Sequence, residues 1–224
     1  MLQCKKPKLA IYGTGGSAVD VYDMVTLCPS LRTAWDGIVF IDDFKEAGEF
    51  NGCPMMPFNA FCETYDVDSV RILITPGEPK AREMLMNRVC ERGYQLATLV
   101  HPLALVSPSA HIGVGVLIQE NVAVCAGATI EDNVWINGKA IVGHDVTIGK
   151  NSVICSFSIV SGHTLVGECC YIGISSAVRD HITIGDHSII SMGAAVMKNV
   201  RQKMIVMGNP AREIAENKDE TVFR

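Results

Sequence analysis

A histidine and an aspartate stand side by side in the middle of the chain, in the segment Gly143-His144-Asp145. Eighteen residues after His144 comes Gly162, which has no side chain. An imidazole beside a bare backbone N–H suits acyl transfer, because the ring removes a proton from the nucleophile while the amide stabilises the oxyanion. A solvent-facing histidine on a hydrophilic edge has the same spacing. The elements that position these residues must decide between the two interpretations.

A glycine-rich turn near the N-terminus, Gly13–Ser17, is a second candidate site. It follows an apolar segment and precedes a helical pattern, where glycines let the backbone approach a phosphate and a helix N-terminus favours an anion. Ala18 stands where a dinucleotide fingerprint has its third glycine, so a plain tight turn remains an alternative. Asp42 and Asp43, which end the next apolar segment, favour a nucleotide site at one sheet edge. Gly77, which follows the third apolar segment, and Arg82, five residues later at the start of a helix, are expected in the same crevice.

Two further groups invite a chemical interpretation. Asp145, His163 and His181 are spaced by eighteen residues, but this spacing matches no metal motif, so we expect a polar ladder and no bound metal. Cys169 and Cys170 are adjacent, and we interpret them as small apolar fillers rather than a redox or metal pair.

The elements around the histidine follow a hexapeptide repeat. One aliphatic residue recurs every six positions without an insertion, and a small residue such as Ala140 or Ser158 often follows four positions later. The series is Val106, Ile112, Ile118, Val124, Ile130, Ile136, Val142, Ile148, Ile154, Val160, Val166, Ile172, Val178, Ile184, Ile190 and Val196. A short strict period predicts stacked coils, and three hexads per coil place residues eighteen apart above one another. The aliphatic residues then point inward, whereas the second and third residues after each one face outward.

The first hundred residues have a different periodicity, typical of a small parallel α/β sheet. We expect strands at 8–13, 37–43 and 69–75, a further short strand at 97–100, and helices at 18–28 and 78–92. The chain is thus divided into a Rossmann-like domain at 1–100, an all-β parallel coil at 101–200, and a C-terminal region at 201–224 with a turn, a short helix from about Ala211 and a fraying tail.

Composition and charge argue against several classes of function. With a net charge of −5 and no basic cluster, the chain is not expected to bind nucleic acid. No apolar run is long enough to span a membrane, and nine scattered cysteines fit the cytoplasm better than a disulfide framework.

Several segments together resemble a known family: IYGTGGSA, FIDDFK, ATLVHPLALVSPSAHIG, GHDVTIG and GNPARE. They are similar to the hexapeptide-repeat sugar acetyltransferases, which include sialic-acid O-acetyltransferases (NeuD-like) and UDP-4-amino-sugar N-acetyltransferases (PglD-like). The resemblance implies a left-handed β-helix and a homotrimer whose active sites, between subunits, take acetyl-CoA as cosubstrate.

The resemblance also implies roles for individual residues. It implies that His144 is the general base, Asp145 the acidic residue beside it and Asn137 an active-site asparagine. The acetyl-CoA site would be lined by Gly162, Ile174 and Met192. The nucleotide sugar would contact Gly15, Gly16, Ser17, Asp42, Asp43 and Gly77. Val153 stands where close relatives have a second histidine that contacts the coenzyme.

The function implied is N-acetylation of a nucleotide-linked amino sugar of the UDP-4-amino type, in surface-glycan or glycoprotein biosynthesis. No loop interrupts the hexapeptide repeats to hold an acceptor. We therefore expect the front domain, residues 1–100, to bind the acceptor. Two alternatives remain: O-acetylation of a sugar such as sialic acid, and a non-catalytic scaffold that binds nucleotide sugars.

Overall fold

The computed structural model describes residues 6–223, whose contacts divide the chain into two units. The first unit runs to Pro76 and resumes at Met84–Ala97, and the second comprises Gly77–Glu83 and the chain from Thr98 onward. Helix α4 therefore contributes its first residues to the second unit and the rest to the first. None of the described helices is both long enough and apolar enough to cross a membrane.

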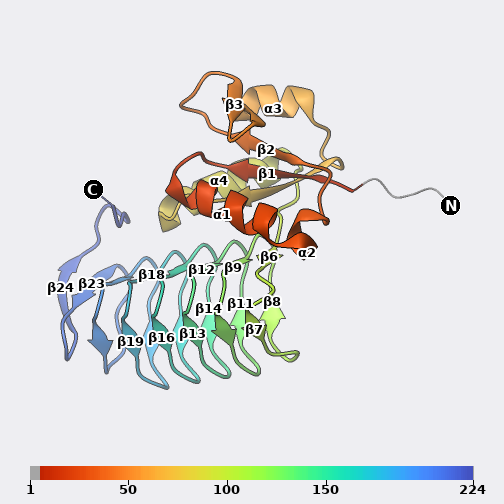
Figure 1. Ribbon diagram of the computed structural model, residues 1–224. Helices are drawn as coiled ribbons and strands as arrows, with labels where there is room; N and C mark the ends of the chain where they lie inside the picture. Colours follow the sequence, from red (N-terminus) through yellow and green to blue (C-terminus); the bar gives the residue numbers. More distant parts are fainter. Residues whose placement is uncertain (1–5, 224) are drawn as a thin grey trace. The chain divides into compact units, whose positions relative to one another are not determined.

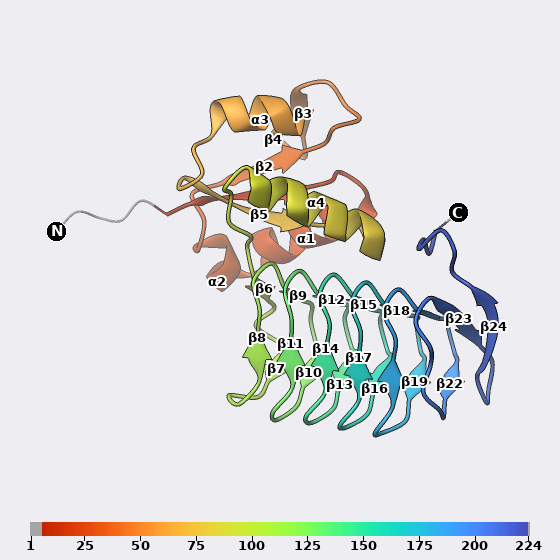
Figure 2. The same ribbon diagram turned by 180° about the vertical axis from the view of Figure 1, so that it is seen from behind.

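The first unit is a five-stranded sheet in the order β3-β4-β2-β1-β5, parallel except for the edge strand β3. Helix α1 lies in front of the sheet in Figure 1 and α4 in front of it in Figure 2, so helices cover both faces. The elements are β1 (Lys8–Tyr12), α1 (Gly16–Leu27), α2 (Pro29–Arg32), β2 (Ile38–Ile41), β3 (Gly48–Phe50), β4 (Cys53–Met56), α3 (Phe58–Thr64), β5 (Val70–Ile74) and α4 (Pro79–Glu91).

The strands expected at 8–13, 37–43 and 69–75 and the two expected helices are confirmed to within a few residues. The strand expected at 97–100 is β6 (Leu99–Val100), which pairs with Leu117–Ile118 of the second unit and not with the five-stranded sheet. The β3–β4 hairpin and α3 were not expected, because their segments are too short to show a period. β1 pairs in parallel with β2 and β5, so the carboxyl ends of these strands share one edge of the sheet. The turn at 13–16 and the pair Asp42-Asp43 follow directly at that edge.

The second unit is mainly a left-handed parallel β-helix built from one two-residue strand per hexad. Val142 pairs in register with Val124 on one side and Val160 on the other, which confirms the repeat of eighteen residues per coil. The strands are β6 (Leu99–Val100), β7 (Leu105–Val106), β8 (His111–Ile112), β9 (Leu117–Ile118), β10 (Ala123–Val124), β11 (Thr129–Ile130), β12 (Trp135–Ile136), β13 (Ile141–Val142), β14 (Thr147–Ile148), β15 (Val153–Ile154), β16 (Ile159–Val160), β17 (Leu165–Val166), β18 (Tyr171–Ile172), β19 (Ala177–Val178), β20 (Thr183–Ile184), β21 (Ile189–Ile190) and β22 (Ala195–Val196).

These strands form three sheets, one on each face of the coil. We name each sheet by one of its members: the β12 sheet (β6, β9, β12, β15, β18, β21), the β13 sheet (β7, β10, β13, β16, β19, β22) and the β14 sheet (β8, β11, β14, β17, β20). A tight turn joins each strand to the next sheet, so the turns lie along three edges.

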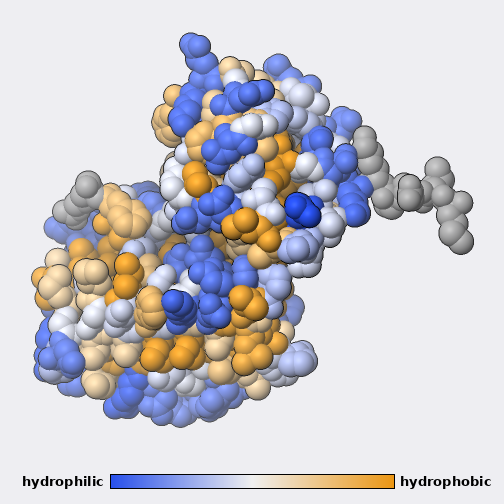
Figure 3. Space-filling model, in the orientation of Figure 1, coloured by the Kyte–Doolittle hydropathy of each residue, from blue (hydrophilic) through white to orange (hydrophobic). Residues whose placement is uncertain are grey.

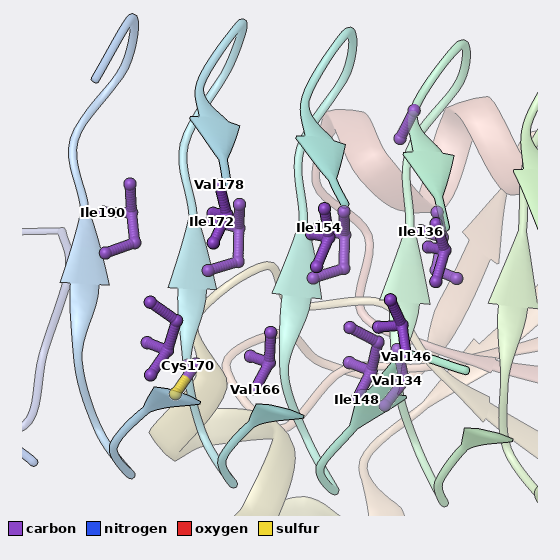
Figure 4. Packing of buried hydrophobic residues seen from close by; sticks show 14 of the residues in the cluster. Val134, Ile136, Val146, Ile148, Ile154, Val166, Cys170, Ile172, Val178 and Ile190 are labelled. Carbon is purple, nitrogen blue, oxygen red and sulfur yellow. The ribbon is translucent and has the colours of Figure 1, made fainter. Parts of the chain in front are cut away.

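The aliphatic series fills the interior of the coil, as its period predicts. From Ile118 to Val196 every member is at most 2% exposed. Figure 4 shows Ile136, Ile154, Ile172 and Ile190 in a row, one from each successive coil. Val106 and Ile112 are only half-buried, because β7 and β8 end their sheets and have a neighbouring strand on one side alone. Each coil thus covers the apolar residues of its neighbours, and this packing holds the turns in register.

The C-terminal region is a β-hairpin, and the helix expected from about Ala211 is wrong. β23 (Met204–Met207) pairs in parallel with β21, and β24 (Arg212–Glu216) pairs antiparallel with β23. The open edge of β23 has unpaired backbone N–H and C=O groups. A neighbouring strand can form hydrogen bonds with these groups, whereas a helix cannot. The tail does not project freely either, since the N–H groups of Val222 and Phe223 donate to Oε2 of Glu78.

Candidate active site

His144 lies on the edge of the coil where the β13 sheet turns into the β14 sheet. Its side chain is 59% exposed, as expected for the second residue after an inward aliphatic, and its Nδ1 lies 2.9 Å from Oδ2 of Asp145. A carboxylate only accepts hydrogen bonds, so this contact places the proton on Nδ1 and leaves a lone pair on Nε2. The hydrogen bond from His144 and the charges of His163 and His144 lower the pKa of Asp145. The pair therefore has the geometry of an oriented base.

Gly162 lies against the ring of His144, in the next coil. A Cβ at position 162 would come within 2.6 Å of His144 Nε2 and 2.7 Å of Cε1, so a side chain there would displace the ring. Within residues 6–223 the carbonyl of Gly162 accepts a hydrogen bond from the N–H of His181, whereas no backbone carbonyl accepts one from the Gly162 N–H. The expected juxtaposition of the imidazole and a bare backbone amide is thus present in a single chain.

The spacing of eighteen also places His163 and His181 on this edge. His163 Nδ1 lies 3.8 Å from Oδ2 of Asp145, and its ring meets that of His144 edge-on at 4.8 Å. The ring of His181 stacks on His163 at 4.6 Å. The ligand atoms of His144, Asp145 and His163 lie within 4.8 Å of one another, a donor set that suits a divalent cation. That no metal belongs here stays a prediction from the sequence.

The other residues expected around acetyl-CoA lie elsewhere on the coil. Ile174 and Met192 are 44% and 70% exposed and follow β18 and β21, at the edge where the β12 sheet turns into the β13 sheet. The whole β13 sheet separates this edge from His144. The Asn137 amide donates to the carbonyl of Ile154 at 3.3 Å, and within residues 6–223 no hydrogen bond joins it to His144. One chain therefore does not bring these three residues together with the base.

The glycine turn of the first unit combines one strained position with open ones. Gly13 has a φ of 115°, and a Cβ there would lie 2.7 Å from Thr75 Oγ1, so this residue must be glycine. At Gly15 and Gly16 a Cβ would meet nothing within 4 Å, although they form the cap and first residue of α1. The fold of the chain therefore does not require glycine at either position. The open space lies beside the N-terminus of α1, where Ser17 also stands.

The two aspartates that follow β2 differ in their partners. Asp42 accepts hydrogen bonds from Thr14 Oγ1 and the N–H of Phe44. Asp43 accepts from Tyr12 at 2.5 Å, from the N–H of Phe58 at 3.0 Å and from Arg88 at 2.6 Å. Burial alone would raise the pKa of Asp43, but these donors together lower it. Three protein donors favour a structural role for Asp43, and a contact with nucleotide from either aspartate stays a prediction.

Gly77 and the first residues of α4 belong to the second unit. Gly77 leaves open space where a Cβ would be, whereas Arg82, which we placed in the same crevice from the sequence, is fully buried against the coil. Arg82 donates to the carbonyl of Asn133 at 2.7 and 3.0 Å and to its Oδ1 at 2.8 Å, and Asn133 donates to Asn151. Burial lowers the pKa of the guanidinium to about 9. Arg82 is therefore an anchor of α4, and its position in the sequence gave no sign of this role.

Cys169 and Cys170 are both buried, which supports their interpretation as fillers. Burial raises the pKa of each thiol to about 12, so neither supplies a thiolate at neutral pH.

The comparisons with known proteins agree with this architecture. Residues 127–162 match the bacterial transferase hexapeptide model (six repeats), and residues 8–89 match the PglD N-terminal domain. The acetyltransferase domain of PglB from Neisseria gonorrhoeae FA1090 is 30% identical, with a TM-score of 0.85, over 93% of this chain and 100% of that one. The perosamine N-acetyltransferase of Caulobacter crescentus is 26% identical, with a TM-score of 0.83 in one of its structures, over 93% of this chain and 97% of that one.

A curated relative gives the same assignment. The GDP-perosamine N-acetyltransferase of Escherichia coli O157:H7 is 27% identical over 184 residues, which are 79% of this chain and 82% of that one. Fold and front domain together define a left-handed β-helix acyltransferase. The chain belongs to the hexapeptide-repeat sugar acetyltransferase family.

Proposed function

We propose that the protein transfers the acetyl group of acetyl-CoA to the amino group of a nucleotide-linked amino sugar, with His144 as the general base. The observation that carries the proposal is the His144–Asp145 pair set against Gly162 in a chain of this family. Among the similar structures, the PglB domain has been solved with acetyl coenzyme A, and the C. crescentus enzyme with CoA and GDP-perosamine.

The chemistry needs no covalent enzyme. The neutral sugar amine attacks the thioester carbonyl carbon while Nε2 of His144 takes a proton from the nitrogen, and Asp145 stabilises the imidazolium that forms. The Gly162 N–H donates to the developing oxyanion. When the C–S bond breaks, the imidazolium returns the proton to the sulfur, so the products are the acetamido sugar and CoA.

The acceptor is assigned to the front domain. The open space at Gly15 and Gly16 beside the N-terminus of α1 suits the phosphates of a nucleotide sugar, and Asp42 at the same sheet edge suits a ribose hydroxyl. The resemblance implies a UDP-linked 4-amino sugar, whereas the E. coli relative is a GDP-perosamine N-acetyltransferase and the C. crescentus enzyme was solved with GDP-perosamine. We therefore propose UDP as the first nucleotide to test and GDP as the second.

We further propose a homotrimer whose active sites lie between subunits. On the outer face of the β13 sheet, Leu105, Ile141 and Ile159 are 75%, 40% and 41% exposed, which is typical of an interaction surface. Figure 3 shows hydrophobic residues gathered along the coil. A neighbouring copy would also bring the edge with Ile174 and Met192 toward the His144 edge, which one chain keeps apart.

Replacing Ile159 by glutamate is expected to weaken the trimer about tenfold or more, because a carboxylate in an apolar interface loses its hydration. Light scattering over a dilution series measures the effect. Thr183→Glu, at the outward position of a strand in the β14 sheet, is the matched control. A trimer unaffected by Ile159→Glu would contradict this interface.

The activity is tested by CoA release from acetyl-CoA with UDP-, GDP- and dTDP-linked amino sugars. We expect one nucleotide amino sugar to support turnover at least 100-fold faster than the free amino sugar, because the front domain contributes binding to the nucleotide. The same nucleotide should protect the first unit against heat. Turnover with a free sugar alone, without protection by any nucleotide, would instead favour the O-acetyltransferase alternative.

A further inference from the structure

We propose that Glu78 and the C-terminal segment 217–223, which we call the strap, together position the turn at Gly77 for the nucleotide sugar. The proposal rests on the proposed function and on the nucleotide-sugar contact expected at Gly77. Glu78 is then a positioning residue, because it acts through the strap and the backbone of the turn.

The segment Gly77–Glu83 belongs to the second unit, although the residues on either side of it belong to the first. Shortly before it, Thr75 is fixed to the sheet of the first unit, because its N–H and its Oγ1 both donate to the carbonyl of Tyr12. Gly77 is thus the first residue that the sheet no longer holds. Its position must be set by contacts within the second unit.

Glu78 connects this turn to the strap. Its Oε2 accepts hydrogen bonds from the N–H groups of Val222 at 2.8 Å and Phe223 at 3.0 Å. Its Oε1 is buried and has no hydrogen-bond partner within residues 6–223. A carboxylate taken out of water depends on its remaining donors, so Glu78 and the two amides of the strap hold one another in place.

A second set of contacts joins the strap to the same turn. Lys80 donates to the carbonyl of Asp219 at 2.9 Å and lies 3.9 Å from Oε2 of Glu220. Oε1 of Glu220 lies 2.6 Å from Nζ of Lys203, directly before β23. The strap is rooted at Asn217, which is 2% exposed and whose N–H donates to the carbonyl of Lys203. The strap therefore connects the beginning of α4 to the hairpin at the end of the coil.

The helix itself has an independent anchor. Arg82 binds the carbonyl and Oδ1 of Asn133, and its N–H donates to the carbonyl of Glu78. These contacts do not involve the side chain of Glu78. Release of the strap is therefore expected to leave α4 on the coil and to free only the turn before it.

The test uses Glu78→Ala, with Glu78→Gln as the conservative variant. Alanine removes the acceptor for both strap amides. Glutamine keeps one carbonyl oxygen that can accept both, and its NH2 group replaces an oxygen that has no hydrogen bond. Hydrogen exchange of the peptide 217–223 measures release of the strap. Titration with UDP-, GDP- and dTDP-linked amino sugars measures affinity.

We expect Glu78→Ala to speed exchange of the strap about tenfold or more, because its two amides lose their acceptor. Affinity for the nucleotide sugar should fall about tenfold, because the freed turn must be ordered on binding. The value of kcat and the KM for acetyl-CoA should stay within about twofold of wild type, since the coil around His144 is unchanged. Glu78→Gln should resemble wild type in all four measurements.

A second variant and a control act from the other side. Glu220→Ala releases the strap from Lys203 and leaves Glu78 in place, and it should weaken nucleotide-sugar binding about threefold. Combined with Glu78→Ala it should add little, because both substitutions act through the strap. Glu213→Ala is the matched control, since Glu213 pairs with Arg201 in the same hairpin but lies outside the strap. Its affinity for the nucleotide sugar should equal that of wild type.

A released strap with unchanged nucleotide-sugar affinity overturns the proposal, and so does unchanged exchange of the strap in Glu78→Ala. If the wild-type protein binds none of the nucleotide amino sugars, the proposed function fails as well. Binding by the wild type with equal affinity in Glu78→Ala confines the failure to the role of the strap.

Discussion

Replacing His144 by alanine is expected to lower kcat about 10³-fold, the usual range for loss of a general base being about 10² to 10⁴. Without the ring, the attacking amine must give its proton to water. Affinity for acetyl-CoA should change little, because the imidazole acts on the nucleophile. Turnover and isothermal titration with acetyl-CoA measure the two effects separately.

His111→Ala is the control, since His111 is also an exposed histidine of the coil but lies on the outer face of β8. It should retain wild-type turnover. If His144→Ala keeps kcat within about threefold of wild type, another group removes the proton and the assignment of the base is wrong.

Replacing Gly162 by alanine is expected to lower kcat about 10²-fold, because the new Cβ would overlap the His144 ring at 2.6 Å. The ring is the end of an exposed side chain and turns away, so stability should fall by less than about 1 kcal/mol. Side chains are tolerated at this corner in other coils, where Ala126 stands thirty-six residues before Gly162 and Asp180 eighteen residues after it. The backbone amide remains, and the loss therefore reports the position of the base.

A double-mutant cycle decides whether Gly162 acts through His144. In a His144→Ala background the Cβ of Ala at position 162 meets no ring, and the second substitution should then cost less than about threefold in kcat. If the loss of kcat in the double variant equals the combined losses of the two single variants, Gly162 contributes independently of the ring.

The coil and the position of its base could be predicted from the sequence because both follow from a local period. Once Val142 and Val160 point inward, the eighteen-residue coil places His144 beside Gly162 without reference to any other element. The same arithmetic places Asp145 beneath His163. A strict repeat fixes which residues are neighbours, whereas an ordinary fold does not.

Features that depend on non-periodic partners could not be predicted in this way. Arg82 lies on an ordinary helical pattern, and only the carbonyl of Asn133 on the coil explains its burial. Asp43 has three donors from three separate segments. The residues after Pro210 form a strand because they pair with the open edge of β23. Their own sequence shows no pattern from which this partner could be predicted.

The separation of Ile174 and Met192 from His144 has a similar origin. Their spacing from one another is eighteen, so they share an edge, but their spacing from His144 places them one sheet away. Acetyl-CoA that touches both edges must then lie between two copies of the chain, which connects the proposed site to the proposed trimer.

The central claim is transfer of an acetyl group to nitrogen, and identification of the product tests it most directly. The enzyme is incubated with acetyl-CoA and the best nucleotide amino sugar, and the product is examined by mass spectrometry and NMR. We predict a gain of one acetyl group per sugar, bonded to the former amine nitrogen, and no such product with His144→Ala on the same time scale. An acetyl group on a hydroxyl oxygen, or CoA release without an acetylated sugar, would contradict the account.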